Sequence, residues 1–195
     1  MPLLEVSNLR VTLTTARGPA DALRDVAFTL DRGDTVGLIG ESGCGKSITA
    51  LALMGLLPEG AQVAGSIRLD GQELTALDEA GWCDLRGRRI GMVFQEPMTA
   101  LNPLHPIGRQ VAEPLRVHRG LSAAAARAEA LRLLERVQLP QAARRLDAYP
   151  HQLSGGQRQR VVIAIALACG PDLLLADEPT TALDVTIQRE VLDLI

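Results

Sequence analysis

The sequence predicts an α/β fold in which a mainly parallel sheet is flanked by helices. Short, fully apolar runs alternate along the chain with helix-like segments, a pattern typical of strands buried on both faces of a sheet. One of these runs enters a glycine-rich loop that continues as an apolar helix. The first third reads as strands and the middle as helices. We therefore also expect an antiparallel β-lobe near the N-terminus and a helical lobe at about 96–160.

The composition is that of a globular chain. It has 195 residues, of which 47% are apolar, so it can bury a core without disulfides. The longest apolar run, 161–169, has nine residues, whereas a membrane-spanning helix needs about 20. The N-terminus lacks the basic and apolar regions of a secretory signal. We therefore expect a cytosolic chain that reaches a membrane only through a partner.

Charge and cysteine usage argue against several classes of function. With 20 basic and 23 acidic residues the net charge is −3, which disfavours a nucleic-acid binder that relies on bulk electrostatics. The cysteines form no C-x-x-C pair, which favours free thiols over a zinc ribbon or redox dithiol; they are Cys44, Cys83 and Cys169. The histidines lack the spacing of a metal site; they are His105, His118 and His151.

The N-terminal part is expected to contain strands separated by turns. Apolar positions within 6–13 and the alternating pattern at 26–30 predict two strands. Residues 35–39 should form a third, short and apolar, that enters the glycine-rich loop. The helix after the loop should cover 48–57 and stop at the following proline. A strand at 66–69 should end in an Asp-Gly turn.

The second half should alternate buried strands with helices. Residues 90–94 and 173–177 predict buried strands, and the second of them ends in an acidic residue. Several prolines interrupt the stretch between 97 and 114, and Ser122 is then expected to cap a helix. Three helices are expected in this half: 122–137, from the glycine pair to 169, and 186–195.

A phosphate-binding loop is the first motif that carries chemistry. The pattern G-x-x-x-x-G-K-[ST] is matched by Gly40, Glu41, Ser42, Gly43, Cys44, Gly45, Lys46 and Ser47. Its glycines let backbone N–H groups face phosphate oxygens, and the following helix adds its positive end. Lys46, the single lysine among 20 basic residues, supplies a point charge, and Ser47 a hydroxyl for Mg²⁺. A glycine-rich turn without function would not require a lysine at this position, which disfavours that interpretation. We interpret Cys44 as a small residue that fills space in the loop rather than as a catalytic thiol.

A pair of acids follows the apolar strand at 173–177. A parallel strand delivers Asp177 to the carboxyl edge of the sheet, where ligands bind, and there Asp177 would hold Mg²⁺ through water. Glu178 can orient or deprotonate the attacking water. An Asp-Glu-Pro turn without function is the competing interpretation, which the loop at 40–47 disfavours.

A second helix start with exposed backbone donors lies at residues 153–157. Ser154 can cap this helix, and Gly155 and Gly156 leave the first N–H groups open. This arrangement makes a second anion site although the nucleotide already has one. Two such sites in one chain suggest that two chains share each nucleotide.

With these motifs the sequence resembles the nucleotide-binding subunit of ABC transporters, from near residue 5 to the end. Residues 40–47 look like the Walker A loop, 153–157 the signature motif, and 173–177 the Walker B strand with Glu178 as catalytic glutamate. The resemblance implies a Q-loop at Gln95, a further catalytic residue and a ligand of Mg²⁺ with Ser47 and Asp177, and a D-loop at 181–184. It also implies that ATP is contacted by Ser154, Gly155, Gly156 and Gln157.

Three stretches look like the peptide and nickel importer ATPases, the oligopeptide/dipeptide group: 94–103, 149–153 and 182–188. The resemblance implies an ATP-hydrolysing motor subunit, held peripherally on the cytoplasmic face of the inner membrane. Its partners would be a second ATPase subunit, transmembrane permease subunits and, indirectly, a substrate-binding protein, but no nucleic acid. The groove for a permease helix would be formed by Gln95 and the stretch to about Pro106. One ABC ATPase domain is expected, with a β-lobe and Walker A core at 1–95, a helical lobe at 96–160 and the Walker B part at 161–195.

Two departures from the family pattern bear on function. Leu13 stands where the family places an aromatic residue that stacks on adenine. The chain ends 17 residues after Glu178, before the switch histidine and cysteine-rich tail of the family, so we expect a truncated chain. Two alternatives therefore stay open beside the importer motor. One is an ATP-binding module without turnover, and the other is a soluble ABC ATPase outside transport.

Overall fold

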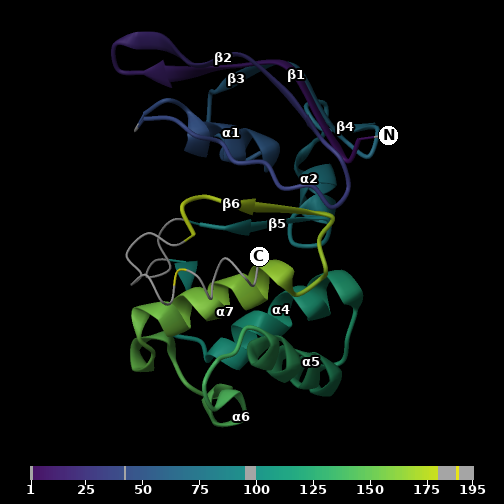
Figure 1. Cartoon of the computed structure of the whole chain (residues 1–195), viewed down its shortest axis with the longest axis vertical. Coiled ribbons are helices and arrows are strands. Elements are labelled where there is room, and N and C mark those ends of the chain that lie inside the picture. Colours follow the sequence, from purple (N-terminus) through teal and green to yellow (C-terminus); the bar gives the residue numbers. More distant parts are fainter. Residues whose placement is uncertain (1, 42, 95–99, 180–187, 189–195) are drawn as a thin grey trace. The chain divides into compact units, whose positions relative to one another are not determined.

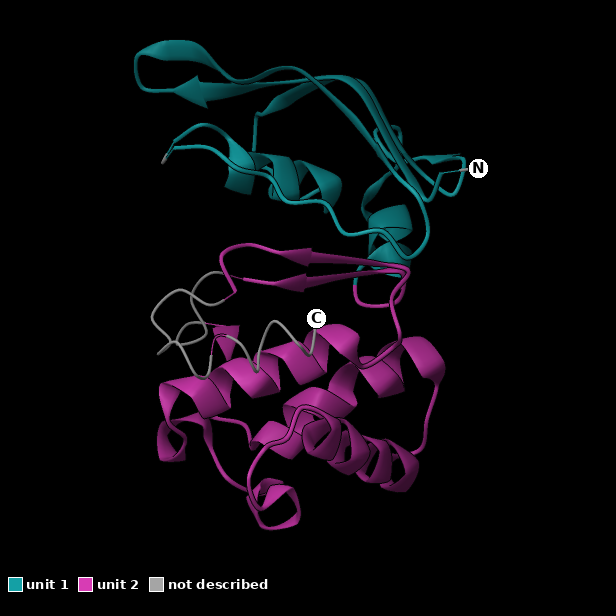
Figure 2. Ribbon diagram, in the orientation of Figure 1, with its two compact units in different colours: residues 1–86 teal, residues 87–195 magenta. Residues whose placement is uncertain are grey.

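The computed structural model describes residues 2–41, 43–94, 100–179 and 188, and the chain forms two compact units, 1–86 and 87–195 (Figure 2). The first unit holds an antiparallel sheet, and the second holds a parallel strand pair with the helices of the middle segment. The predicted combination of an antiparallel β-lobe, a helical lobe and parallel strands is therefore confirmed. The finer subdivision of the domain at 95 and 160 stays a prediction.

The sheet of the first unit has the strand order β2-β1-β3-β4 (Figure 1). Its strands are antiparallel and are β1 (Leu4–Thr15), β2 (Gly18–Leu30), β3 (Gln62–Leu69) and β4 (Gln72–Glu73). Residues 4–15 and 18–30 thus form longer strands than the patterns predict, while the Asp-Gly turn after β3 is confirmed.

A bulge in β1 explains why its apolar positions are unevenly spaced. Val6 and Leu9 are three apart, yet both are buried, because the register shifts between them. Asn8 inside this shift adopts a left-handed backbone, with φ 49°. Gly65 of β3 faces the bulge, and a Cβ there would lie 2.4 Å from the Asn8 carbonyl oxygen. The bulge therefore requires glycine on the neighbouring strand.

Two helices accompany this sheet. Helix α1 (Lys46–Leu53) ends earlier than predicted, because Gly55 turns the chain with φ 61°. Helix α2 (Glu79–Leu85) is absent from our sequence prediction, although the Asp78 cap that accepts from the Gly81 N–H at 2.8 Å is a recognisable start signal. Arg86 closes the end of α1 by donating to the carbonyls of Met54 at 2.8 Å and Gly55 at 2.7 Å.

The strand predicted for 35–39 is wrong for this structure. Within the described residues this segment belongs to neither sheet. Val36 and Leu38 are half exposed, and Ile39 is 100% exposed. A strand is maintained by hydrogen bonds to a neighbouring strand, and an apolar run does not by itself provide that neighbour.

Glu73 closes the turn between β3 and β4 with an unusually complete set of donors. Its carboxylate accepts from the Ser66 hydroxyl, from the Ile67 N–H at 3.1 Å and from the Thr75 hydroxyl at 2.7 Å. Burial raises the pKa of this carboxyl and is the largest single influence. The hydrogen bonds from Ser66, Thr75 and Ile67 together outweigh it and lower the pKa of Glu73 from 4.5 to about 2.

We expect Glu73→Gln to destabilise the first unit at neutral pH by about 1–2 kcal/mol. This expected loss is smaller than the full pKa shift would give, because the Glu73 side chain is about a third exposed and solvent screens its charge. A depressed pKa means that the carboxylate contributes its full stability above pH 4.5. It loses this contribution as the pH falls toward 2. Urea unfolding followed by circular dichroism should show a midpoint difference that shrinks across this window. The exposed Glu59→Gln variant is the control, and a pH-independent difference for Glu73→Gln would contradict the assignment.

The second unit packs helices against a two-stranded parallel sheet. Strands β5 (Ile90–Val93) and β6 (Leu173–Ala176) pair in register from Ile90 opposite Leu173 to Val93 opposite Ala176. Both are confirmed, each one residue shorter than predicted. The helical elements are α4 (Ile107–Arg119), α5 (Ala123–Arg136), α6 (Ala142–Arg145), the short 3₁₀ helix η1 (Pro150–Gln152) and α7 (Gly155–Leu167).

Helix α7 is the central element of this unit. It lies between the β5–β6 pair and helices α4 and α5, and its apolar residues fill the shared core (Figure 1). The predicted cap of α5 is confirmed, since Ser122 accepts from the Ala125 N–H at 3.3 Å. None of the helices among the described residues is long and apolar enough to cross a membrane.

Candidate nucleotide-binding site

The glycine-rich loop leads directly into helix α1, as the motif predicts. Gly43 and Gly45 adopt left-handed backbones, with φ 81° and 98°. The first turn of the helix is braced by Thr49, whose hydroxyl and N–H both donate to the Gly45 carbonyl, at 2.9 and 2.8 Å. The loop therefore presents the positive end of a helix, the arrangement that binds anions.

The ammonium group of Lys46 lies across this loop. Its Nζ donates to the carbonyls of Gly40 at 2.7 Å and Glu41 at 3.0 Å, and it lies 3.9 Å from the Cys44 Sγ. Ser47 follows in the helix and is exposed. An ammonium group and a hydroxyl thus lie at the loop and helix start, and both groups suit a phosphate chain with a bound cation.

The loop is seated on strand β2 through a very close contact at Gly45. A Cβ at this position would lie 2.6 Å from the Leu23 Cδ2 and 3.1 Å from the Ala22 carbonyl oxygen. A second close contact involves Gly40, where a Cβ would lie 2.5 Å from the Cys44 Sγ. The glycines therefore serve packing as well as backbone freedom.

We expect Gly45→Ala to weaken nucleotide binding about tenfold or more and to lower the thermal transition, since the methyl group displaces the loop from β2. Gly120→Ala is the matched control. Gly120 also has a left-handed backbone, with φ 62°, but a Cβ there meets nothing within 4 Å. Both variants carry the backbone cost of about 1–2 kcal/mol, and only Gly45→Ala should affect nucleotide affinity measured by calorimetry. Equal affinities in the two variants would contradict this role for the contact.

The acidic pair lies at the carboxyl end of β6, in the second unit. The Asp177 N–H donates to the Val93 carbonyl at 3.0 Å and so extends the β5–β6 ladder by one bond. Asp177 is half-buried, whereas Glu178 is exposed and has a left-handed backbone, with φ 47°. The expectation that an apolar strand delivers these acids to the carboxyl edge of the parallel strands is confirmed.

The start of α7 has the predicted cap. Ser154 accepts from the Gln157 N–H at 3.4 Å, and the Gln157 side chain accepts from the Ser154 N–H at 3.2 Å, which makes a reciprocal capping box. Ser154 and Gly155 are exposed, and Gly156 is buried. Gly155 has open space where a Cβ would be, so a ligand can approach the helix start closely.

Two arginine side chains hold the start of α7 in place through hydrogen bonds that no sequence motif predicts. The Arg145 Nη1 donates to the Gln157 Oε1 at 2.9 Å, and the Arg158 Nε donates to the Pro150 carbonyl at 2.7 Å. These bonds fix the helix start to α6 and η1. Their partners are 12 and 8 residues apart, beyond the reach of a local capping motif.

Several predicted positions lie outside the described residues. They are Ser42, Gln95, the D-loop at 181–184 and, except for residue 188, the helix at 186–195. Leu13, the expected neighbour of adenine, is half-buried in β1 opposite Ala20. The Walker A loop belongs to the first unit, and the acidic pair belongs to the second.

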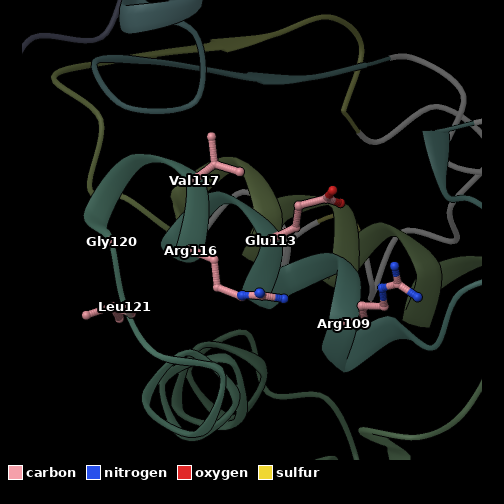
Figure 3. Close-up of a pocket in the computed structure, with 6 residues that line it drawn as sticks. All are labelled: Arg109, Glu113, Arg116, Val117, Gly120 and Leu121. Carbon is pink, nitrogen blue, oxygen red and sulfur yellow. The ribbon is translucent and has the colours of Figure 1, made fainter.

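A hollow of about 410 Å³ lies on the helical lobe, and its lining residues belong to none of these motifs (Figure 3). Charged side chains of α4 line it, and the full set is Arg109, Glu113, Arg116, Val117, Gly120 and Leu121. No group of three or more metal-binding His, Cys, Asp or Glu side chains occurs in the described part of the chain.

The glycine-rich loop that opens a helix, the acidic pair after a parallel strand and the capped helix start are all carried by one α/β fold. The chain belongs to the ABC transporter family, whose sequence model matches residues 23–181. A protein of Brucella abortus is 53% identical over all 195 residues. The oligopeptide transport ATP-binding protein OppD of Salmonella typhimurium is 51% identical over 193 residues, 99% of this chain. The chain spans 59% and 58% of the lengths of these two relatives.

Solved structures of dimeric cassettes share the fold. The ATP-binding cassette MJ0796, in a dimeric post-hydrolysis state bound to ADP and Pi, matches with a TM-score of 0.87 at 33% identity. The match covers 98% of this chain and 80% of that one. A second dimeric structure of MJ0796, a bacterial ABC transporter cassette, matches with a TM-score of 0.86 at 32% identity, with the same coverage.

Proposed function

We propose that the protein carrying these residues is the ATP-binding and ATP-hydrolysing motor subunit of an ABC importer for peptides or a related small solute such as nickel. The observation that carries this proposal is the Walker A loop, with the Lys46 ammonium turned onto its carbonyls at the start of α1. Oligopeptide transport in the name of the OppD relative at 51% identity supports the cargo class.

ATP would be held between two chains. The loop at 40–47 would hold the phosphates in one chain. There the Lys46 ammonium would donate to phosphate oxygens in place of the loop carbonyls to which it now donates. The residues 154–157 of a second ATPase subunit would cover the same nucleotide with their open helix start. The dimeric state of the MJ0796 cassettes supports such a pairing.

The donor set suits Mg²⁺, a hard cation that prefers oxygen ligands. Ser47 offers an exposed hydroxyl and Asp177 a half-buried carboxylate, and Gln95 would add its amide oxygen. Bound Mg²⁺ would neutralise charge that develops on the phosphates. Glu178 and Gln95 are the residues proposed to act on the attacking water, Glu178 as the base and Gln95 by orientation.

The membrane partners would be permease subunits, with a substrate-binding protein acting indirectly. The chain would sit peripherally on the cytoplasmic face of the inner membrane. Leu104, which is 78% exposed in the segment before α4, supports a docking groove formed by Gln95 and the stretch to Pro106. The buried Gln110 holds this segment by donating to the carbonyls of Asn102 at 3.0 Å and His105 at 2.8 Å. A permease helix would therefore meet the exposed Leu104 side chain on a segment held by Gln110.

The proposal is tested on the full-length protein reconstituted with its permease subunits in vesicles. ATP outside the vesicles should drive uptake of labelled peptides, with Ni²⁺ uptake measured in parallel to separate the two cargoes. ATP binding without steady-state hydrolysis would instead identify a binding module without turnover. Hydrolysis that neither permease subunits nor cargo influence would point to a soluble ABC ATPase outside transport.

A further inference from the structure

Gln159, in the second turn of α7, is a buried polar residue that the motifs leave unused. Its side chain is 1% exposed, and a buried amide is costly unless it forms hydrogen bonds. Its Nε2 donates to the Pro179 carbonyl at 2.7 Å. Its Oε1 accepts no hydrogen bond from the part of the chain that the structure describes. The amide therefore has one strong bond, and that bond reaches the turn after the acidic pair.

The backbone around Glu178 is anchored on both sides. Before it, the Asp177 N–H donates to the Val93 carbonyl at 3.0 Å, and after it the Pro179 carbonyl accepts from Gln159 at 2.7 Å. Between these anchors Glu178 has φ 47°, a left-handed conformation that non-glycine residues adopt only where the surroundings impose it. The direction of the Glu178 carboxylate depends on this conformation.

We propose that Gln159 is a positioning residue that fixes the left-handed turn at Glu178 by holding the Pro179 carbonyl. This inference rests on the proposed role of Glu178 as the base for the attacking water. The same helix begins at Ser154, which would contact the nucleotide of the other subunit. Helix α7 would thus connect two nucleotide sites. Its start would contact the ATP bound by the other subunit, and its Gln159 would orient Glu178 at the ATP bound by its own subunit.

The test uses the full-length protein with its partner subunits. Gln159→Met keeps an unbranched side chain of similar length and removes the donor. We expect kcat for ATP hydrolysis to fall ten- to a hundredfold, while the ATP Kd and KM stay within about twofold of wild type. Gln159→Asn keeps the amide but shortens the side chain, and it should give the same separation of kcat from KM.

Arg160→Met is the matched control on the same turn of α7. Arg160 is 8% exposed, and its Nη1 donates to the Val137 carbonyl at 2.7 Å, in the segment after α5. It should lower the thermal transition without the selective fall in kcat. A merely structural role of Gln159 predicts that Gln159 and Arg160 variants change kcat and KM alike.

Glu178→Gln distinguishes a failure of the positioning role of Gln159 from a failure of the proposed function. If Glu178→Gln stops turnover while Gln159→Met and Gln159→Asn both keep the wild-type kcat, the positioning role is overturned and the proposed function stands. If Glu178→Gln itself hydrolyses ATP at the wild-type rate, the proposed base and the positioning role fall together. A kcat loss in both Gln159 variants, with unchanged ATP affinity, supports the inference.

Discussion

Lys46→Ala is expected to weaken ATP binding by about 10- to 100-fold, in line with the loss of one charge-assisted contact of about 1.5–3 kcal/mol. The side chain forms its hydrogen bonds with the carbonyls of Gly40 and Glu41 and takes no part in a core. The thermal transition should therefore stay within about 1 °C of wild type. Fluorescence titration with a labelled ATP analogue and differential scanning calorimetry measure the two quantities.

Lys46→Arg is the informative second variant at this position. It keeps the positive charge but replaces a compact ammonium by a larger, planar guanidinium, whose donors point in fixed directions. We expect it to bind ATP more weakly than wild type. If Lys46→Ala bound ATP with unchanged affinity and an unchanged thermal transition, the Walker A assignment would be wrong.

Glu178→Gln should leave ATP binding intact or slightly tighter and reduce hydrolysis by about 100- to 10,000-fold, the usual contribution of a general base. The carboxylate has no role in holding phosphate, because it would place negative charge beside negative charge. Its exposed position after β6 suits contact with a water at the γ-phosphate. Steady-state phosphate release from the full-length protein measures turnover, and calorimetry measures ATP affinity.

The same variant should also change the state of association. Without hydrolysis two subunits would stay closed on ATP, each contributing its residues 154–157 to the partner's nucleotide, as we propose. Size-exclusion chromatography with ATP and Mg²⁺ should then show a dimer for Glu178→Gln and mostly monomer for wild type. Glu135→Gln, on an exposed position of α5, is the control and should behave as wild type. Wild-type turnover in Glu178→Gln would remove Glu178 from the catalytic role.

The sequence by itself determined the features that depend on neighbours within a few residues. Ser122 and Ser154 cap their helices through donors three residues away, and the Asp-Gly turn after β3 is equally local. The Walker A loop has the same character, since the Lys46 ammonium meets carbonyls five and six residues back. Such contacts form whenever the residues are present in that order, so a motif is sufficient to predict them.

Tertiary structure alone decided the features that join distant segments. Residues 35–39 have the composition of a strand but have no ladder partner among the described residues, since pairing depends on a second segment. The bulge at Asn8 requires Gly65, which is 57 residues away. The bond from Gln159 to Pro179 crosses 20 residues. A hydrogen bond of this kind forms only when both segments are packed side by side. An amino-acid pattern indicates the structural propensity of each segment, but it does not indicate which distant segment will pack against it.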